Sequence, residues 1–231
     1  MALDHSLTYK EHKIKNVPHK QRLNTIISVL ESEVDFVDKT YADVGCSNGY
    51  VTALINDKFK PLEASGYDDD RDNLEIAKQT YPHINFKYID LNTHGSFDGY
   101  DIVTCFETLE HVGNLQNGVQ NLLDLAGSSK GVLFISVPIE IGVIGLIKFL
   151  VKTIFYGYDL KELPPSRNSY SKYFIALLTG GKLSIFRDHR TSWGTHFGFD
   201  YRDIDDFFLS HNVPYRAFNK FTTRFYIVRF E

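Results

Sequence analysis

The stretch DVGCSNG, residues 43–49, decides the fold that we expect for this chain. It follows a short run typical of a β-strand and precedes apolar residues at helical spacing, so it marks a turn from strand to helix. Glycines at such a turn let the backbone come close to a ligand, because no Cβ stands in the way. The acidic residue Asp68 ends the next expected strand, 19 positions after Gly49. A carboxylate at that place can accept both hydroxyl groups of a ribose.

The glycine spacing argues against a nicotinamide nucleotide as the ligand. The dinucleotide-binding fingerprint is GxGxxG, with the pyrophosphate on the N-terminus of the following helix. Here the turn reads GxSxG, from Gly45 through Ser47 to Gly49. The carboxylate of Asp43, two residues before the first glycine, would repel a diphosphate. The pattern therefore favours a nucleoside that carries positive charge.

Helical and strand patterns alternate along residues 18–137. Helices are expected at about 19–33, 51–55, 73–80 and up to 127, and strands at about 41–45, up to 68, 84–89, 100–106 and 131–137. This alternation predicts a parallel, doubly wound α/β sheet. After it come a helix at 201–210 and two closely spaced strands at 214–218 and 223–230, which favour an antiparallel hairpin. We therefore expect a mostly parallel seven-stranded sheet whose last strand is antiparallel, with a helical insertion after the fifth strand.

The composition is that of an ordinary globular protein. The 231 residues are 43% hydrophobic and carry a formal net charge of −4, which argues against binding nucleic acid through bulk charge. Two cysteines cannot build a disulfide framework. The first thirty residues are polar and contain no apolar run, so we expect no signal peptide and a cytoplasmic location.

We expect one domain over residues 1–231 with four parts. Residues 1–35 would form an N-terminal helical cap and residues 36–138 the ligand-binding core. Residues 139–195 would form a helical insertion that serves as a lid over the substrate. Residues 196–231 would add a helix and a β-hairpin that complete the sheet.

Five motifs in this order resemble the class I S-adenosylmethionine-dependent methyltransferases. The glycine turn resembles that superfamily's first motif, with Ser47 where glycine is commoner. The other elements are Asp68 after the second strand, Ile89-Asp90-Leu91 after the third, CFETLEHV at 105–112 and SVP at 136–138. The likeness covers residues 40–138, and the C-terminal hairpin fits by topology, whereas the insertion is not covered.

The resemblance implies S-adenosylmethionine as cofactor and assigns its contacts. Gly45 and Gly49 would allow close approach of the methionine part, and Asp43 would orient its amino group. Asp68 would hold the ribose, Asp90 the adenine amino group with Leu91 on the ring, and Phe106 would close the pocket below the sulfonium. The full set is Asp43, Gly45, Cys46, Ser47, Gly49, Asp68, Asp69, Asp90, Leu91 and Phe106. Two alternatives stay open: Asp90 could form an Asx turn, and Asp69 and Asp70 could be acids at a helix start.

A metal site is a further expectation. Glu107, Glu110 and His111 have the spacing of one face of a single helical turn, and His196 could be a fourth ligand. Two carboxylates and imidazoles suit a divalent ion such as magnesium or zinc. The ExxEH run resembles the ubiquinone-pathway O-methyltransferases and the small-RNA 3′-end 2′-O-methyltransferases, in which a metal positions the substrate hydroxyl. Alternatively, His111 acts as a general base without metal, Glu107 is structural, and His196 only caps a helix.

The insertion allows three interpretations. Residues 139–157 present a wide apolar face with Lys148 and Lys152 one turn apart, too short and too charged for a membrane span. The segment could be a lid on the sheet, an oligomer interface, or a helix on a membrane surface. We expect acceptor recognition in this half, which holds Arg167, Tyr170, Lys172, Tyr173, Arg187, His189, Arg190 and Trp193.

The leading functional prediction is methylation of a hydroxyl oxygen on a small-molecule, sugar or lipid-linked acceptor. His111 and Glu107 are its expected catalytic residues. Two alternatives remain: an RNA 2′-O-methyltransferase, and a non-catalytic protein that binds S-adenosylmethionine or serves in assembly. The net charge and the lack of an RNA-binding module in the sequence argue against the first. The intact set of Asp43, Gly45, Gly49 and Asp68 argues against the second.

Overall fold

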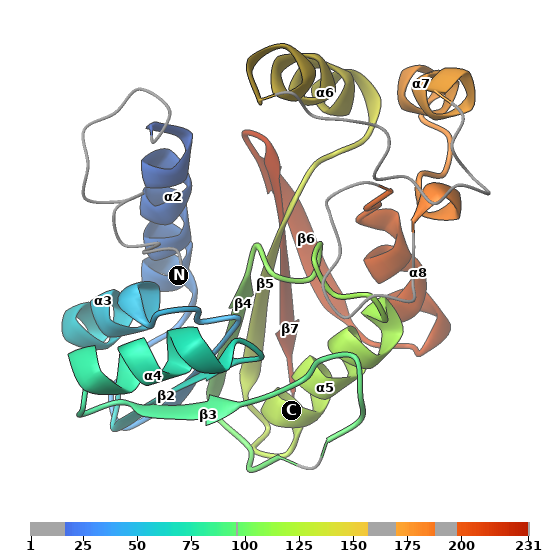
Figure 1. Cartoon of the computed structure of the whole chain (residues 1–231). Helices are drawn as coiled ribbons and strands as arrows, with labels where there is room; N and C mark the ends of the chain where they lie inside the picture. Colours follow the sequence, from blue (N-terminus) through green and yellow to red (C-terminus); the bar gives the residue numbers. More distant parts are fainter. Residues whose placement is uncertain (1–16, 96, 157–169, 188–197, 231) are drawn as a thin grey trace.

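The centre of the protein is a single seven-stranded sheet (Figure 1). The computed structural model describes residues 17–95, 97–156, 170–187 and 198–230. The strand order is β3-β2-β1-β4-β5-β7-β6. The strands are β1 Thr40–Val44, β2 Glu63–Asp68, β3 Asn85–Tyr88, β4 Ile102–Phe106, β5 Val132–Pro138, β6 Tyr215–Lys220 and β7 Thr223–Arg229. The first five strands pair in parallel, and β7 pairs antiparallel with both β5 and β6. The predicted topology is thus confirmed, with strand ends shifted by one or two residues.

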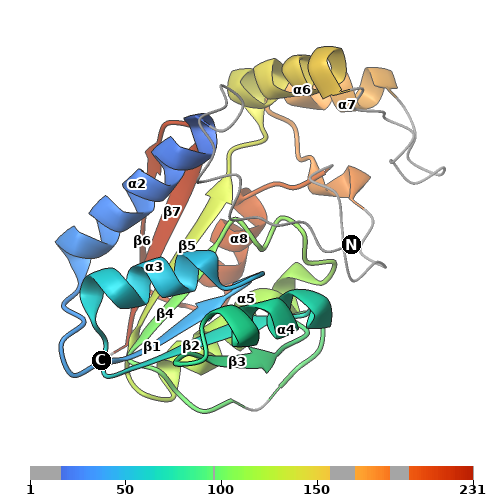
Figure 2. The ribbon, with the colours of Figure 1, turned by 60° about the vertical axis from the view of Figure 1, so that its left-hand side comes forward.

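Helices cover both faces of this sheet, as the alternating pattern predicts (Figure 2). They are α2 Val17–Glu33, α3 Tyr50–Phe59, α4 Arg71–Thr80, α5 Leu115–Gly127 and α8 Arg202–Ser210. One apolar cluster joins α2, α3 and α4 to the sheet, and the other joins α5 and α8 to its opposite face. All seven residues of β5 are buried, because a strand covered on both faces has no solvent side.

Two helix starts next to the glycine turn have local causes. Gly49 precedes α3 with a φ of 76°, a left-handed conformation that favours glycine. Helix α4 begins at Arg71, two residues earlier than expected, because the Asp70 carboxylate accepts hydrogen bonds from the backbone N–H groups of Asp72 and Asn73. Both helices therefore begin at the carboxyl-end edge of the parallel strands.

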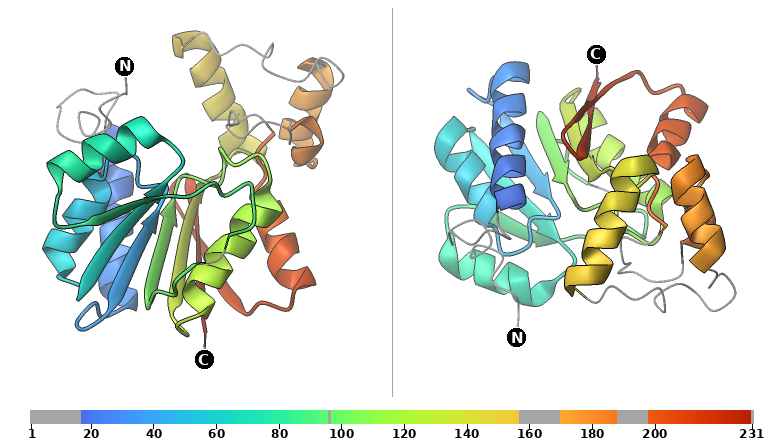
Figure 3. Two further views of the ribbon diagram at one scale, coloured as in Figure 1. Left: turned by 60° about the horizontal axis from the view of Figure 1, so that its bottom comes forward. Right: turned by 90° about the horizontal axis from the view of Figure 1, so that it is seen from above.

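The expected insertion forms two helices after β5, α6 Gly142–Tyr156 and α7 Tyr170–Thr179, followed by a short 3-10 helix, η4 Ser184–Phe186. The two helices lie side by side beyond the carboxyl ends of the parallel strands (Figure 3). A small apolar core of Tyr173, Leu177, Leu183 and Phe186 joins α7 to η4, and Phe149 of α6 packs against it. The predicted Pro164-Pro165 turn lies outside the described residues. Among the described helices, none is long and apolar enough to span a membrane.

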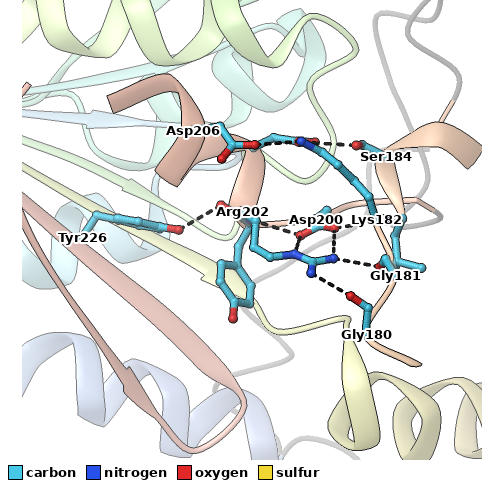
Figure 4. A network of polar contacts seen from close by, with 11 residues as sticks. Gly180, Gly181, Lys182, Ser184, Asp200, Arg202, Asp206 and Tyr226 are labelled. Carbon is cyan, nitrogen blue, oxygen red and sulfur yellow. Dashed lines mark hydrogen bonds and ion pairs between the residues drawn. The ribbon is translucent and has the colours of Figure 1, made fainter. Parts of the chain in front are cut away.

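A polar network ties this insertion to α8 (Figure 4). The fully buried carboxylate of Asp200 pairs with Arg202, with 2.6 Å between Oδ2 and Nη2. The same guanidinium donates hydrogen bonds to the backbone carbonyls of Gly180 and Gly181, each at 2.8 Å. Lys182 adds ion pairs to α8 through Asp206 at 2.7 Å and Asp203 at 2.9 Å. The insertion is therefore fixed at its α7 end.

Candidate functional site

One cavity of about 860 Å³ opens at the carboxyl ends of β1, β2, β4 and β5. Open parallel sheets bind ligands at this edge, and the volume is that of a small-molecule site. Residues of α2 and α6 also form part of its wall. Eight of the ten predicted cofactor residues line it: Asp43, Gly45, Cys46, Ser47, Asp68, Asp69, Leu91 and Phe106.

The glycine turn leaves no room for a side chain at its first glycine. Gly45 has a φ of 83°, and a Cβ added there would lie 2.0 Å from Oγ1 of Thr108. The turn is held against β2 because the N–H groups of Gly45 and Cys46 both donate to the carbonyl of Tyr67. Gly49 does not line the cavity, since its Cα hydrogens face Phe86, whose ring would lie 2.6 Å from an added Cβ. Packing thus excludes a side chain at both glycines, but only Gly45 lines the cavity, and its close approach to a ligand remains a prediction.

Asp43 is a buried carboxylate in the cavity wall. Its oxygens accept hydrogen bonds from the hydroxyls of Thr52 at 2.6 Å and Thr104 at 2.9 Å. Burial raises the pKa of Asp43 from 3.8 to about 6, and the nearby charge of Asp68 acts in the same direction. A cationic ligand group beside this carboxylate would lower its pKa again. The two threonines, which the sequence did not single out, orient the carboxylate.

Asp68 joins the glycine turn to the start of α4. One carboxylate oxygen accepts a hydrogen bond from the N–H of Ser47 at 2.7 Å, and the other accepts one from the N–H of Asp70 at 2.9 Å. Burial raises the pKa of Asp68 as well. Each carboxylate oxygen has a further lone pair, so the group can still accept hydrogen bonds from a ligand.

Asp90 has the geometry of the Asx-turn alternative. Its Oδ1 accepts hydrogen bonds from both the backbone N–H and the side-chain amide of Asn92, each at 2.9 Å. Asp90 itself does not line the cavity, whereas its neighbours Ile89, Leu91 and Asn92 do. The contact between Asp90 and an adenine amino group remains a prediction.

The expected helical turn at Glu107, Glu110 and His111 is wrong. Residues 107–113 form a loop before α5, because Glu107 adopts a φ of 53°, which interrupts any helical spacing. The Glu107 carboxylate is engaged by Arg22 of α2 at 2.8 Å and by the Ser136 hydroxyl at 3.0 Å. Within the described ranges, no three His, Cys, Asp or Glu side chains come together as a metal site. His196 lies outside the described residues.

Glu107, Glu110 and His111 nevertheless all line the cavity. Glu110 is 1% exposed, and burial raises the pKa of its carboxyl well above the ordinary value, with the charge of Glu107 adding to the effect. Its Oε2 has no hydrogen-bond partner in the part of the chain that the structure describes. His111 is half-buried, and its backbone N–H donates to the carbonyl of Thr108. The site thus places an imidazole in a cavity that also holds Asp43 and Asp68.

The N-terminal helix contributes cavity residues that are not among the predicted site residues. His19, Arg22, Leu23 and Ile26 of α2 line the cavity opposite α6. The spacing of Arg22 beside the apolar face of α2 was a usable signal, because a basic residue at the edge of a buried face often reaches a partner. On the other side, Lys148 of α6 pairs with Glu140 at 3.4 Å.

Comparison with known proteins gives one family and several relatives. The family model described as "Methyltransferase domain" matches residues 19–152. A "Putative methyltransferase 235L" of Invertebrate iridescent virus 6 is 30% identical over 115 residues, which is 50% of this chain and 43% of the relative. The "Ubiquinone biosynthesis O-methyltransferase" of Rickettsia canadensis (strain McKiel) is 28% identical over 167 residues, covering 66% of this chain and 64% of the relative. The chain thus spans less than two thirds of the length of these curated relatives.

Solved structures share the fold over almost the whole chain. Magnesium protoporphyrin IX methyltransferase (ChlM) from Synechocystis PCC 6803, crystallised with bound SAH, has a TM-score of 0.62 at 14% identity and covers 98% of this chain and 92% of its own. The methyltransferase domain of bacterial CtHen1-CN has a TM-score of 0.57 at 19% identity, covering 91% and 98%. At these identities the likeness concerns the fold alone.

Proposed function

Because the chain belongs to the methyltransferase domain family, we propose that it transfers a methyl group from S-adenosylmethionine to a hydroxyl oxygen of a small-molecule acceptor. The observation that carries this proposal is the continuity of one cavity from Asp43 and Asp68 to His111. The lack of a side chain at Gly45 and the buried carboxylate of Asp43 fit a cationic nucleoside. The expected class of enzyme agrees with the family and the fold.

The protein's part in the reaction is to align the reactants and exclude water. S-adenosylmethionine, when bound, supplies the methyl group on a sulfonium and leaves as S-adenosylhomocysteine. Asp68 would hold the ribose and Asp43 the ammonium group. His111 would accept the proton of the acceptor hydroxyl as the oxygen forms its new bond to the methyl carbon.

The acceptor's class follows from the outer part of the cavity. The cavity is lined by Leu23 and Ile26 of α2 and by Ile147 and Val151 of α6, and the last two are 56% and 44% exposed. An acceptor with a hydroxyl-bearing head and an apolar portion would bury these side chains. Several relatives are named ubiquinone biosynthesis O-methyltransferases, which supports an oxygen target and a lipid-linked acceptor. RNA is the alternative acceptor, and the net charge of −4 argues against it.

Contact with a lipid surface is part of the same proposal. Helices α6 and α7 contain no Asp or Glu, and Val143 and Leu150 of α6, which do not line the cavity, are 72% and 43% exposed. Such a face suits the interface of a membrane. Flotation with vesicles that contain anionic lipid tests it, and V143E/L150E should remain at the bottom of the gradient. Equal flotation of the two proteins would contradict the contact.

The direct test follows labelled methyl groups from S-adenosylmethionine into fractionated cell extract. We expect label in a small-molecule or lipid fraction with the wild type, loss with D68N and H111Q, and full transfer with H83Q, a change at an exposed histidine. Label that nuclease removes would indicate RNA instead. Chelator-sensitive transfer would indicate a divalent ion, for which the described side chains of Glu107, Glu110 and His111 do not form a ligand cluster. Failure of S-adenosylhomocysteine to raise the melting temperature would contradict the proposal.

A further inference from the structure

The end of the insertion reaches the loop that carries Glu110 and His111. Arg187, directly after η4, is 4% exposed. Its Nη2 donates to the backbone carbonyls of Val112 at 2.7 Å, Glu110 at 2.9 Å and Leu109 at 3.4 Å. These partners lie 75 to 78 positions earlier in the chain. One buried guanidinium thus donates hydrogen bonds to three backbone carbonyls of a single loop.

Phe199 and Gly198 lie directly against Arg187. Its guanidinium lies over the ring of Phe199 at 5.3 Å. Gly198 has a φ of 70°, and a Cβ there would lie 2.6 Å from the backbone nitrogen of Arg187. Only glycine therefore allows the backbone at residue 198 to lie this close to the backbone at residue 187. Burial lowers the pKa of Arg187 to about 10, and the charge of Glu110 opposes this change. At neutral pH the side chain therefore remains a cation that donates to the loop.

We infer that Arg187 is a positioning residue for His111. By holding the carbonyls on both sides of His111, it fixes the backbone from which the imidazole enters the cavity. The insertion would then contribute to the chemical step as well as to acceptor binding. The inference concerns loop geometry, and only its consequence for turnover rests on the proposed methyl transfer.

Arg202 provides a matched control. It too is an arginine that donates to two insertion carbonyls, those of Gly180 and Gly181, and pairs with the buried Asp200. In the part of the chain that the structure describes, the hydrogen bonds recorded for Arg202 go to Asp200, Gly180 and Gly181. A loss of stability alone would therefore follow from either change, whereas displacement of His111 would follow only from a change at Arg187.

The experiment follows the His111 ring signal in the full chain labelled with ¹³C-histidine, assigned with H111Q and measured with saturating S-adenosylhomocysteine. We expect R187M to shift and broaden the His111 signal, R187K to shift it less because the ammonium can still donate, and R202M to leave it in place. The signals of His83 and His211 serve as references within each sample. In turnover, kcat of R187M should fall about 10- to 100-fold, since small misplacements of catalytic groups cost that much, while its affinity for S-adenosylhomocysteine stays within about twofold of the wild type.

An unchanged His111 signal in folded R187M would overturn the inference, as would an equal displacement in R202M. If R187M does not fold, R187K decides, and a His111 signal identical to that of the wild type would again contradict it. Failure of the wild type to bind S-adenosylhomocysteine would instead contradict the proposed function. In that case the comparison of R187M with R202M is made without ligand, and the inference about loop geometry stands or falls on it.

Discussion

Nη1 of Arg22 lies 2.8 Å from Oε2 of Glu107, and this ion pair connects the N-terminal helix to the end of β4. The side chains are only 24% and 15% exposed, so the pair is partly shielded from solvent. Burial raises the pKa of Glu107, whereas Arg22 and the Ser136 hydroxyl lower it. The pair thus connects α2 to the cavity wall and opposes the net rise in the pKa of the Glu107 carboxyl.

A double-mutant cycle of R22M and E107Q should therefore give a coupling free energy of about 1–3 kcal/mol. R22M alone is expected to destabilise most, because it leaves Glu107 without its cation. Urea unfolding at pH 7 measures the three variants. The control is the pair of Lys58 in α3 and Glu31 in α2, which are also 2.8 Å apart but 44% and 48% exposed. Its coupling should stay below about 1 kcal/mol, and equal coupling in the two pairs would contradict the argument.

The second prediction separates Asp68 from Asp69, which both line the cavity. D68N keeps the shape of the side chain and weakens its acceptor strength, so S-adenosylhomocysteine should bind about 10- to 150-fold more weakly, as expected for loss of a hydrogen bond to a charged group. D69N should bind within about twofold of the wild type if Asp69 is an acid of the helix start. Calorimetric titration of the three proteins decides. A larger effect from D69N than from D68N would mean that Asp69, and not Asp68, contacts the ribose.

The third prediction concerns pH and Asp43. Its pKa in the folded protein is about 6, above the ordinary value of 3.8. A carboxyl whose pKa is raised by folding adds stability below its unfolded pKa, and that stability is lost as pH rises through the folded pKa. At 1.36 kcal/mol per unit of pKa, the contribution is about 3 kcal/mol. The free energy of unfolding of the wild type should therefore fall relative to that of D43N between about pH 4 and pH 6.5.

The cofactor should reverse this trend. An ammonium group beside Asp43 favours the ionised carboxylate, so binding releases a proton and tightens as pH rises through about 6. Affinity for S-adenosylhomocysteine, measured from pH 5 to pH 7.5, should rise in the wild type and stay flatter in D43N. Parallel profiles for the two proteins would mean that Asp43 does not face the ligand's cation.

Much of the fold could be predicted from local patterns. The apolar runs of β1, β4 and β5 and the alternation of strands with helices are properties of neighbouring residues, and they led to the observed sheet. The glycine turn was recognisable for the same reason, since Gly45 and Asp68 are defined by their places at strand ends.

The errors and omissions at the site come from contacts between distant residues. The ExxEH spacing predicted a helical turn, but Glu107 pairs with Arg22 and adopts a left-handed backbone, which no local pattern encodes. Arg187 was expected to take part in binding the acceptor. Its guanidinium instead donates hydrogen bonds to backbone carbonyls of a loop 75 to 78 positions earlier in the chain. The Asx turn at Asp90 is local by contrast, because the side-chain amide of Asn92 two residues later donates to its Oδ1, and the adenine contact remains a prediction.

The last prediction compares two left-handed glycines, Gly45 and Gly142, with φ values of 83° and 65°. A Cβ at Gly142 meets nothing within 4 Å, so G142A should cost only the left-handed conformation, about 1–2 kcal/mol. A Cβ at Gly45 would lie 2.0 Å from Oγ1 and 2.5 Å from Cγ2 of Thr108, so G45A should cost about 2–5 kcal/mol in total.

Because T108A removes the two atoms of Thr108 that lie nearest, G45A/T108A should recover about 1 kcal/mol relative to the sum of the single changes. The destabilisation of the double variant G142A/T108A should equal the sum of the destabilisations of its two single changes. Ligand binding gives a second comparison. G45A narrows the cavity at the glycine turn and should weaken the binding of S-adenosylhomocysteine. Gly142 does not line the cavity, so G142A should leave this binding unchanged. Unfolding and titration of these five variants and the wild type give both readouts. Equal costs for G45A and G142A would mean that Thr108 gives way, and that the glycine is needed for its backbone conformation alone.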